Sequence, residues 1–230
     1  MSTLKTLDRG LRALDIVSRR ADGISVADLA LDLEVDRAVA YRIVATLEQH
    51  GMVLRLPLDG KLVLGAAVLG LERRFEPQFR RRARPLLDQL ARQAHATAFI
   101  SVAQQDKCAA ILVSEPEDVL IRVGYRVGST HAISKGAAGI AILAGRPPAD
   151  GEPPEVTQAR TSGFSLTKGA LQQGAIGVAC PIGGGTYEAS VGVVAMEDLD
   201  VDRAIDTVKA CAKALSALLT GAAQVTRDTV

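Results

Sequence analysis

The sequence predicts an α+β protein with an N-terminal winged helix-turn-helix, a helical linker and a C-terminal α+β domain. Length is the first observation, because 230 residues exceed one small helical head and suggest about two domains. The second is residues 24–64, which read as two short helices followed by two apolar runs around a turn. The third is the remainder, where β-type runs alternate with helical segments. We expect the three parts to span 1–64, 65–84 and 85–230.

The predicted helical head begins with a helix that closes a three-helix core. Its apolar residues repeat at helical spacing: Leu7, Leu11, Leu14 and Val17. Ser25 then opens a run similar to a capping box, so we expect it to cap a second helix. A hydroxyl at a helix N-terminus could also contact a phosphate. Residues 34–36 form a tight turn, in which Asp36 is the expected N-cap of the third helix.

The third helix is strongly two-sided. At about 100° per residue, one side carries Val39, Ala40, Ile43, Val44 and Leu47. The other side carries Arg37, Ala38, Tyr41, Arg42 and Ala45. Guanidinium groups suit phosphates and guanine edges, and tyrosine hydroxyls commonly bond phosphate oxygens. An ordinary surface helix with solvated charges has the same pattern. The order of the neighbouring elements favours a helix that enters the DNA major groove through its arginine side.

A hairpin is predicted after the third helix. Gly51 occupies the position where a helix often ends in a left-handed residue. Two apolar runs, 52–56 and 61–64, flank a Pro-Leu-Asp-Gly segment, and Asp-Gly between such runs is a strong hairpin signal. Arg55 and Lys61 lie near the ends of this ribbon, where a wing would meet a sugar-phosphate backbone.

Composition narrows the class of protein. Hydrophobic residues make up 48% of the chain but aromatic residues only 3%, so the cores are aliphatic and alanine-rich. Residues 1–84 hold 15 Lys/Arg against 11 Asp/Glu, whereas residues 85–230 hold 12 against 15. A basic head suits a phosphate-binding surface, and the acidic remainder argues against nucleic acid along the whole chain. With no apolar run of membrane-spanning length and no apolar signal core, we expect a cytoplasmic protein that contacts no membrane.

The cysteines predict structure rather than chemistry. Cys108, Cys180 and Cys211 are widely spaced in apolar stretches, which favours buried free thiols. No motif pairs a thiol with a histidine base, and the spacing typical of metal ligands is absent. We therefore expect no catalytic residue, no metal and no cofactor.

The second half alternates strands and helices. Residues 65–84 predict an arginine-rich helical connector interrupted at Pro77, whose basic face is more consistent with solvation than with DNA contact. A helix is expected from Pro85, and a final helix over 202–219. The expected strands are 98–103, 109–114, 119–123, 176–182 and 190–196. Residues 145–156 hold four of the nine prolines and predict a surface loop, and the triple glycine 183–185 predicts a hairpin turn.

A glycine-rich segment, 134–139, predicts the start of a helix that continues through 140–144. Free backbone N–H groups and the positive end of that helix favour an anion there. Gly136 and Gly139 permit close approach, and Lys135 adds charge. A capped helix packed closely on a sheet would suit the same residues, so both interpretations stay open.

Residues 5–71 resemble the N-terminal domain of the IclR-type bacterial transcriptional regulators. The similarity runs through TLDRGLRALDIV, the DLA of the second helix, AYRIVATLEQHGMV and the ribbon ending in Leu64-Gly65. Segments 126–130, 134–139 and 175–182 are similar to the pocket-forming parts of the family's second domain. The resemblance implies a GAF-like domain that binds a small organic effector, commonly a carboxylate, and a linker helix that joins subunits.

The chain departs from the family pattern at several positions. Ala38 and Val39 stand where small hydroxyl residues are usual at the start of the recognition helix. Thr167, Ala170 and Gly177 match an acidic or hydroxyl residue, a glutamate and a small pocket residue, and Ala195 falls near a polar pair. The candidate DNA-binding residues are Ser25, Arg37, Ala38, Tyr41, Arg42, Arg55 and Lys61. By the resemblance, the candidate effector-binding residues are Ser134, Lys135, Gly136, Ala137, Thr167, Gly177 and Ala195.

The leading hypothesis is a ligand-responsive, sequence-specific DNA-binding regulator without catalysis. One winged head reads only a few base pairs, which predicts a homodimer or a dimer of dimers on a palindromic double-stranded operator. Two alternatives belong to other classes. One is a DNA-associated protein without effector sensing, and the other is a small-molecule enzyme within residues 85–230.

Overall fold

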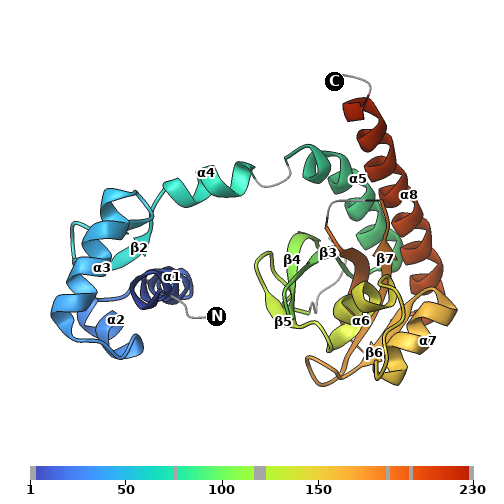
Figure 1. Cartoon of the computed structure of the whole chain (residues 1–230), viewed down its shortest axis with the longest axis horizontal. Coiled ribbons are helices and arrows are strands. Elements are labelled where there is room, and N and C mark those ends of the chain that lie inside the picture. Colours follow the sequence, from blue (N-terminus) through green and yellow to red (C-terminus); the bar gives the residue numbers. More distant parts are fainter. Residues whose placement is uncertain (1–3, 75–76, 117–122, 185–186, 197–198, 228–230) are drawn as a thin grey trace. The chain divides into compact units, whose positions relative to one another are not determined.

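The computed structural model describes residues 4–74, 77–116, 123–184, 187–196 and 199–227. They belong to two compact units, residues 1–77 and 78–230 (Figure 1). The predicted helical connector over 65–84 corresponds to a helix over 67–74, which belongs to the first unit, and to residues 78–84, which lie in the first helix of the second.

The first unit is a winged helix-turn-helix, as the sequence predicted. Its elements are α1 (Lys5–Ser18), α2 (Val26–Asp32), α3 (Arg37–Gln49), β1 (Val53–Arg55), β2 (Leu62–Leu64) and α4 (Ala67–Arg74). The two strands form an antiparallel hairpin in which Val53 pairs with Leu64. Backbone hydrogen bonds of 3.1 and 2.8 Å join Ile24 to Leu62 and so fasten the hairpin to the start of α2.

The first helix packs differently from the prediction. Leu7 and Leu11 were expected in the core, but they are 60% and 59% exposed, and Leu14 is half-buried. Ala13 and Val17 are the buried residues of α1. Only the C-terminal half of α1 reaches the core shared with α2 and α3, so helical spacing alone overstates how much of this helix is covered.

The second unit is an α+β domain, which confirms the predicted class. Its elements are α5 (Pro77–Ala94), β3 (Thr97–Gln104), β4 (Lys107–Ser114), β5 (Thr130–Ala132), α6 (Gly136–Ala144), α7 (Pro154–Ser162), β6 (Ser165–Lys168), β7 (Ala175–Ile182), β8 (Ala189–Met196) and α8 (Val201–Arg227). The sheet has the order β5-β4-β3-β8-β7-β6, and every neighbouring pair is antiparallel.

Helices cover both faces of this sheet. Helix α6 packs on one face, where Ala179 of β7 joins its apolar cluster. The next residue, Cys180, lies on the opposite face near Lys209 of α8. Helix α5 runs beside α8, with the Cys211 Sγ 3.9 Å from the carbonyl oxygen of Leu86 (Figure 1). Among the described residues, no helix combines the length and hydropathy required to cross a membrane.

Most predicted elements of the second unit are confirmed, with differences at short or proline-containing ones. The strands at 98–103, 109–114, 176–182 and 190–196 are present, as is the final helix, which starts at Val201. The expected strand 119–123 falls on 119–122, outside the described residues, and Val123 is not in a strand. Strands β5 and β6 and helix α7 were missed, because three to nine residues carry little periodic signal.

Helix α5 begins at Pro77 rather than at Pro85, which lies inside it. Ala83, Leu87 and Leu90 are buried on one face of the helix. Burying each leucine contributes about 1.5–3 kcal/mol, which offsets the roughly 3 kcal/mol that an interior proline costs. Burial of this face therefore overrides the local tendency of proline to end the helix.

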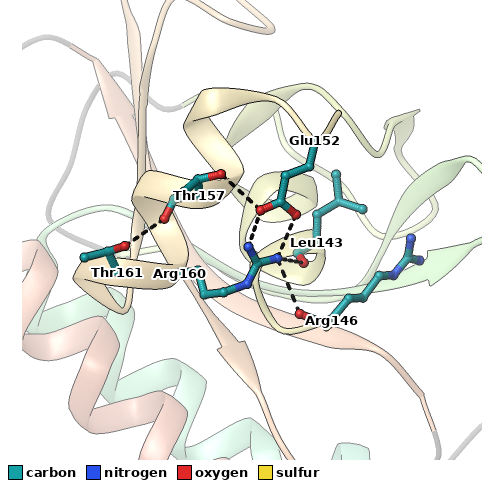
Figure 2. A network of polar contacts seen from close by, with 6 residues as sticks. All are labelled: Leu143, Arg146, Glu152, Thr157, Arg160 and Thr161. Carbon is teal, nitrogen blue, oxygen red and sulfur yellow. Dashed lines mark hydrogen bonds and ion pairs between the residues drawn. The ribbon is translucent and has the colours of Figure 1, made fainter. Parts of the chain in front are cut away.

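The loop after α6 is fastened by one ionic cluster, shown in Figure 2. The Arg160 guanidinium donates to both carboxylate oxygens of Glu152, and Thr157 Oγ1 donates to Glu152 Oε1 at 3.0 Å. Arg160 Nη2 also lies 3.3 Å from the carbonyl oxygen of Leu143 and 3.4 Å from that of Arg146. The predicted loop 145–156 is correspondingly shorter, since α7 starts at Pro154, a proline position that favours helix initiation.

This cluster predicts an acid-sensitive contribution to stability. Hydrogen bonds from Arg160 lower the pKa of Glu152 from an ordinary value of 4.5 to about 2. A lowered folded-state pKa stabilises the fold above pH 4.5, and that stabilisation is lost as the pH falls towards 2. In denaturant titrations between pH 5 and about 2, Glu152→Gln should lose less stability with acid than the unchanged chain. Glu155→Gln, on the exposed side of α7, is the control; a parallel response of all three proteins would contradict the assignment.

Candidate functional site

Helix α3 presents the two sides that its sequence predicted. Ala40, Ile43 and Val44 are buried, and Val39 and Leu47 pack partly against the same core. Arg37, Ala38, Tyr41, Arg42 and Ala45 are exposed, with Tyr41 at 55%. The aliphatic side therefore seats the helix and leaves the arginine and tyrosine side free to meet a ligand.

The turn before α3 sets the direction of this helix. Glu34 has a φ of 55°, and its N–H donates to Leu31 O while that of Val35 donates to Ala30 O, both at 3.0 Å. These two bonds close α2 with a left-handed residue at the position where glycine is common. Asp36 occupies the N-cap position of α3, but its side chain makes no capping bond, contrary to the expected role.

Ser25 caps α2, as predicted. Its Oγ accepts a hydrogen bond of 3.1 Å from the Asp28 N–H and donates one of 2.7 Å to Asp28 Oδ2. The hydroxyl proton is thereby committed within the helix, and a remaining lone pair is available to a donor rather than to a phosphate oxygen.

The cations of this unit fall into two groups. Among the described residues, Arg37 and Arg42 have no carboxylate partner. Arg55 Nε lies 3.4 Å from Glu48 Oε1, and Lys61 Nζ lies 3.5 Å from Asp59 Oδ2. Arg55 thus braces the hairpin against α3, whereas Arg37 and Arg42 keep their full hydrogen-bonding capacity for another molecule.

The second unit contains a cavity of about 300 Å³ between the N-terminal end of α6 and the sheet. Its described lining residues are Phe99, Val123, Gly124, Tyr125, Ser129, Thr130, His131, Gly136, Ala137, Ala138, Thr167, Ala170, Leu171, Gln172, Ala175, Gly177 and Val194. Among them there is no Lys, Arg, Asp or Glu. The polar character of the cavity therefore comes from hydroxyl, amide and imidazole groups.

Four of the seven candidate effector residues line this cavity: Gly136, Ala137, Thr167 and Gly177. Ser134 and Lys135 lie outside it, exposed in the turn before α6, so the expected lysine charge does not face the cavity. Ala195 is also outside the lining. Its neighbour Val194 faces the cavity, and side chains alternate along a strand, so Ala195 lies on the other face of the sheet.

Sequence reasoning missed the aromatic wall of the cavity. Phe99 and Tyr125 stack with ring centroids 4.9 Å apart, and His131 lies next to Tyr125. The sequence did contain a signal for this wall, because tyrosine and histidine are rare in the chain and yet occur close together here. The chain has three tyrosines and three histidines, and one of each falls within the seven residues 125–131.

Two buried serines hold α6 on the floor of the cavity. Ser165 Oγ donates to Ala137 O at 2.6 Å, and Ser190 Oγ donates to Ala138 O at 3.0 Å. A β-carbon at Gly139 would overlap the carbonyl oxygen of Ile133, so only glycine fits there. Among the described residues, the N–H groups of 136–138 have no acceptor. They form a set of unused donors beside the cavity.

The three thiols are free and buried, as predicted. Burial raises the pKa of Cys108 and Cys180 to about 11 and that of Cys211 to about 12. At neutral pH each remains a protonated thiol, which is a poor nucleophile.

Comparison with known proteins bears on both units. Residues 6–57 match the model of the IclR helix-turn-helix domain. The glycerol operon regulatory protein of Streptomyces griseus is 28% identical over 170 residues, which cover 73% of this chain and 66% of that protein. The transcriptional regulator XynR of Escherichia coli (strain K12) is 22% identical over 149 residues, covering 63% of this chain and 58% of that protein. The chain thus spans less than two thirds of the length of these curated relatives.

Solved structures share the fold over nearly the whole chain. An IclR transcriptional regulator from Alicyclobacillus acidocaldarius has a TM-score of 0.78 at 21% identity, covering 95% of this chain and 100% of that one. An IclR homolog from Microbacterium hydrocarbonoxydans, complexed with 4-hydroxybenzoate, has a TM-score of 0.79 at 18% identity, covering 94% and 99%. These likenesses confirm the arrangement of an N-terminal helix-turn-helix and a C-terminal α+β domain.

The left-handed turn predicts a stabilising substitution. A non-glycine residue with positive φ is strained by about 1–2 kcal/mol. Part of this cost is offset because such a residue loses less backbone entropy on folding than glycine does. Glu34→Gly should therefore raise the free energy of unfolding by roughly 0.5–1 kcal/mol, measured by denaturant titration followed by circular dichroism. Glu34→Ala removes the same charge but keeps the strain. An equal gain from both variants would assign the effect to charge and would contradict the backbone explanation.

Proposed function

We propose that the chain is an IclR-type transcriptional regulator whose α3 and hairpin bind double-stranded operator DNA and whose second unit senses a small organic effector. One observation carries the DNA-binding part. The exposed side of α3 has two arginines without carboxylate partners, on a helix seated by its opposite side in a helix-turn-helix domain.

The chemistry of this side suits DNA. A recognition helix places its N-terminal residues against base edges in the major groove. Arg37 lies at the first position of α3, and Tyr41 and Arg42 follow one turn later. We assign base reading to Arg37 and phosphate contacts to Tyr41 and Arg42. The methyl group of Ala38, on the same side of α3, would make an apolar contact with DNA. Ser25 offers a further lone pair near the groove.

The hairpin cations Arg55 and Lys61 can also contact DNA, at a small cost in free energy. Arg55 and Lys61 are paired with Glu48 and Asp59 at distances of 3.4 and 3.5 Å. Exposed ion pairs of this kind contribute only about 0–1 kcal/mol, so a phosphate can replace either carboxylate. A single head reads few base pairs, and useful specificity therefore requires two heads in a homodimer, or more in a dimer of dimers, on a palindromic operator.

The effector part rests on the cavity beside α6. Its volume of about 300 Å³ is at the lower end of ordinary ligand pockets, and its lining is largely apolar with a few neutral polar groups. The unused N–H groups of residues 136–138 favour an acceptor or anionic end of a ligand. The Microbacterium homolog with bound 4-hydroxybenzoate supports a molecule of this size class for this fold. Gly136, Ala137, Thr167 and Gly177 are the candidate contacts that this cavity retains.

Effector binding would act on DNA binding through linkage. A ligand shifts the equilibrium between two arrangements of the chain only if it binds them with different affinity. No step of this mechanism requires catalysis, and the buried, protonated thiols argue against a cysteine-dependent reaction.

Substitution of Arg42 or Arg37 distinguishes a phosphate contact from base reading. Arg42→Ala should weaken binding to all duplexes and reduce the slope of log K against log salt by about 1, because one phosphate contact is lost. Arg37→Ala should instead reduce discrimination between operator and altered operator, by about 1–3 kcal/mol. Fluorescence anisotropy at several salt concentrations measures both effects. Arg203→Ala, on α8 of the other unit, is the control. Unchanged operator affinity in Arg42→Ala would remove this residue from the interface.

Footprinting tests the proposed function as a whole. Footprinting of the purified chain upstream of its own neighbouring genes should show protection over a site with two-fold symmetry. Small metabolites of the pathway encoded there should change the protection. Protection that no metabolite alters would favour a DNA-associated protein without effector sensing. Absence of protection at every salt concentration used would refute the regulator proposal.

A further inference from the structure

A chain of hydrogen bonds ends at the wall of the cavity. Ser101 Oγ lies 3.3 Å from the phenol oxygen of Tyr125, and this oxygen lies 3.3 Å from His131 Nε2. His131 Nδ1 lies 3.1 Å from the carbonyl oxygen of Ala132. Tyr125 and His131 line the cavity, whereas Ser101 is fully buried behind them. Three segments, β3, 123–129 and β5, thus meet through their side chains at one point.

The direction of this chain follows from its last member. A carbonyl oxygen can only accept, so His131 Nδ1 carries a proton, and Nε2 of the neutral ring is then an acceptor. Tyr125 must donate its proton to Nε2. Its oxygen is left with lone pairs only, and the Ser101 hydroxyl occupies one of them. Burial raises the pKa of Tyr125 to about 12, so the phenol keeps its proton at neutral pH.

The phenol oxygen retains capacity for one more donor. Both of its hydrogen bonds, at 3.3 Å, are longer than the roughly 2.8 Å typical of hydroxyl groups. The tilted contact between Tyr125 and Phe99, at an angle of 57°, packs the ring against an aromatic neighbour. The described lining offers no carboxylate that could serve as an alternative acceptor. The acceptors in the described lining are therefore neutral groups, and the phenol oxygen of Tyr125 is one that is held in place by two hydrogen bonds.

We propose that Tyr125 is a specificity-determining residue of the effector cavity and selects ligands that carry a hydroxyl group, by accepting a hydrogen bond from that hydroxyl. The inference rests on the effector-sensing part of the proposed function and names its ligand class. Phe99, Val123 and Val194 surround the site with apolar surface. The preferred ligand is thus a small hydroxylated molecule with an apolar body. An analogue without the hydroxyl leaves one lone pair of the phenol oxygen desolvated and without a donor.

Matched probes test this selection on the full chain. The pairs are 4-hydroxybenzoate with benzoate, and lactate with propionate, each differing by one hydroxyl group. Titration calorimetry at about pH 8, where histidine is ordinarily neutral, gives the dissociation constants. We expect the hydroxylated member of at least one pair to bind about 3–10-fold more tightly. Tyr125→Phe should bring that ratio to about 1, because only the hydroxyl is removed. Tyr187→Phe, at an exposed tyrosine outside the cavity lining, should leave it unchanged.

A second variant guards against a merely structural effect. His131→Leu removes the acceptor for the phenol proton, which can then turn towards the cavity and donate, so the preference for 4-hydroxybenzoate over 4-methoxybenzoate, whose ether oxygen can only accept, should fall. General loosening of the cavity would weaken both members of a pair and preserve their ratio. An unchanged ratio in Tyr125→Phe, or equal binding of both members by the unchanged chain, would overturn the proposal.

The same titrations separate this proposal from effector sensing itself. If a probe changes operator affinity but both members of its pair bind equally, effector sensing stands and hydroxyl selection by Tyr125 is wrong. If neither pair binds, hydroxyl selection is refuted as well, while a footprint that responds to other metabolites would still support effector sensing.

Discussion

Close contact between small side chains holds both functional helices in place. Helix α3 rests on the fully buried Ala40, and α6 approaches the sheet at Gly139, where a larger residue would overlap the Ile133 carbonyl. Aromatic residues make up only 3% of the chain, so the cores reach ordinary packing density by bringing backbones together. A larger side chain at either contact would displace the helix and everything that it presents. Tight packing therefore precedes any particular contact with DNA or ligand.

Under the proposed function, the two units recognise their ligands with different electrostatics. The side of α3 presents Arg37 and Arg42 without intramolecular carboxylates in the described structure, which keeps their charge available to phosphates. The cavity has no charged side chain among its described lining residues. Its selectivity must come from directed groups, such as the phenol of Tyr125 and the backbone N–H groups at the start of α6. Buried hydrogen-bonded groups discriminate by what an incorrect ligand leaves unpaired.

Periodicity in the sequence predicted the elements whose burial is regular. The two sides of α3 and the long strands β3, β4, β7 and β8 follow directly from their apolar patterns. Periodicity failed where tertiary packing determines the structure, as for Pro85, which lies inside α5. The cavity shows the same division. Gly136 and Gly177 were accessible through resemblance, whereas the contact between Ser101 and Tyr125 joins segments 24 residues apart and has no local signature. Ala195 was displaced by one position, which on a strand means the opposite face.

Under the proposed function, binding of DNA and binding of an effector respond differently to salt, because α3 is charged and the cavity lining is neutral. Association with DNA releases counterions and weakens steeply as salt rises. A hydrogen bond to Tyr125 and apolar contact with Phe99 involve no long-range charge, so screening leaves them nearly unaffected. Any effect of an effector on operator binding therefore reflects the linkage between conformations rather than competition for charge. Because linkage is reciprocal, operator DNA must alter effector affinity by the same factor, at any salt concentration at which both bind.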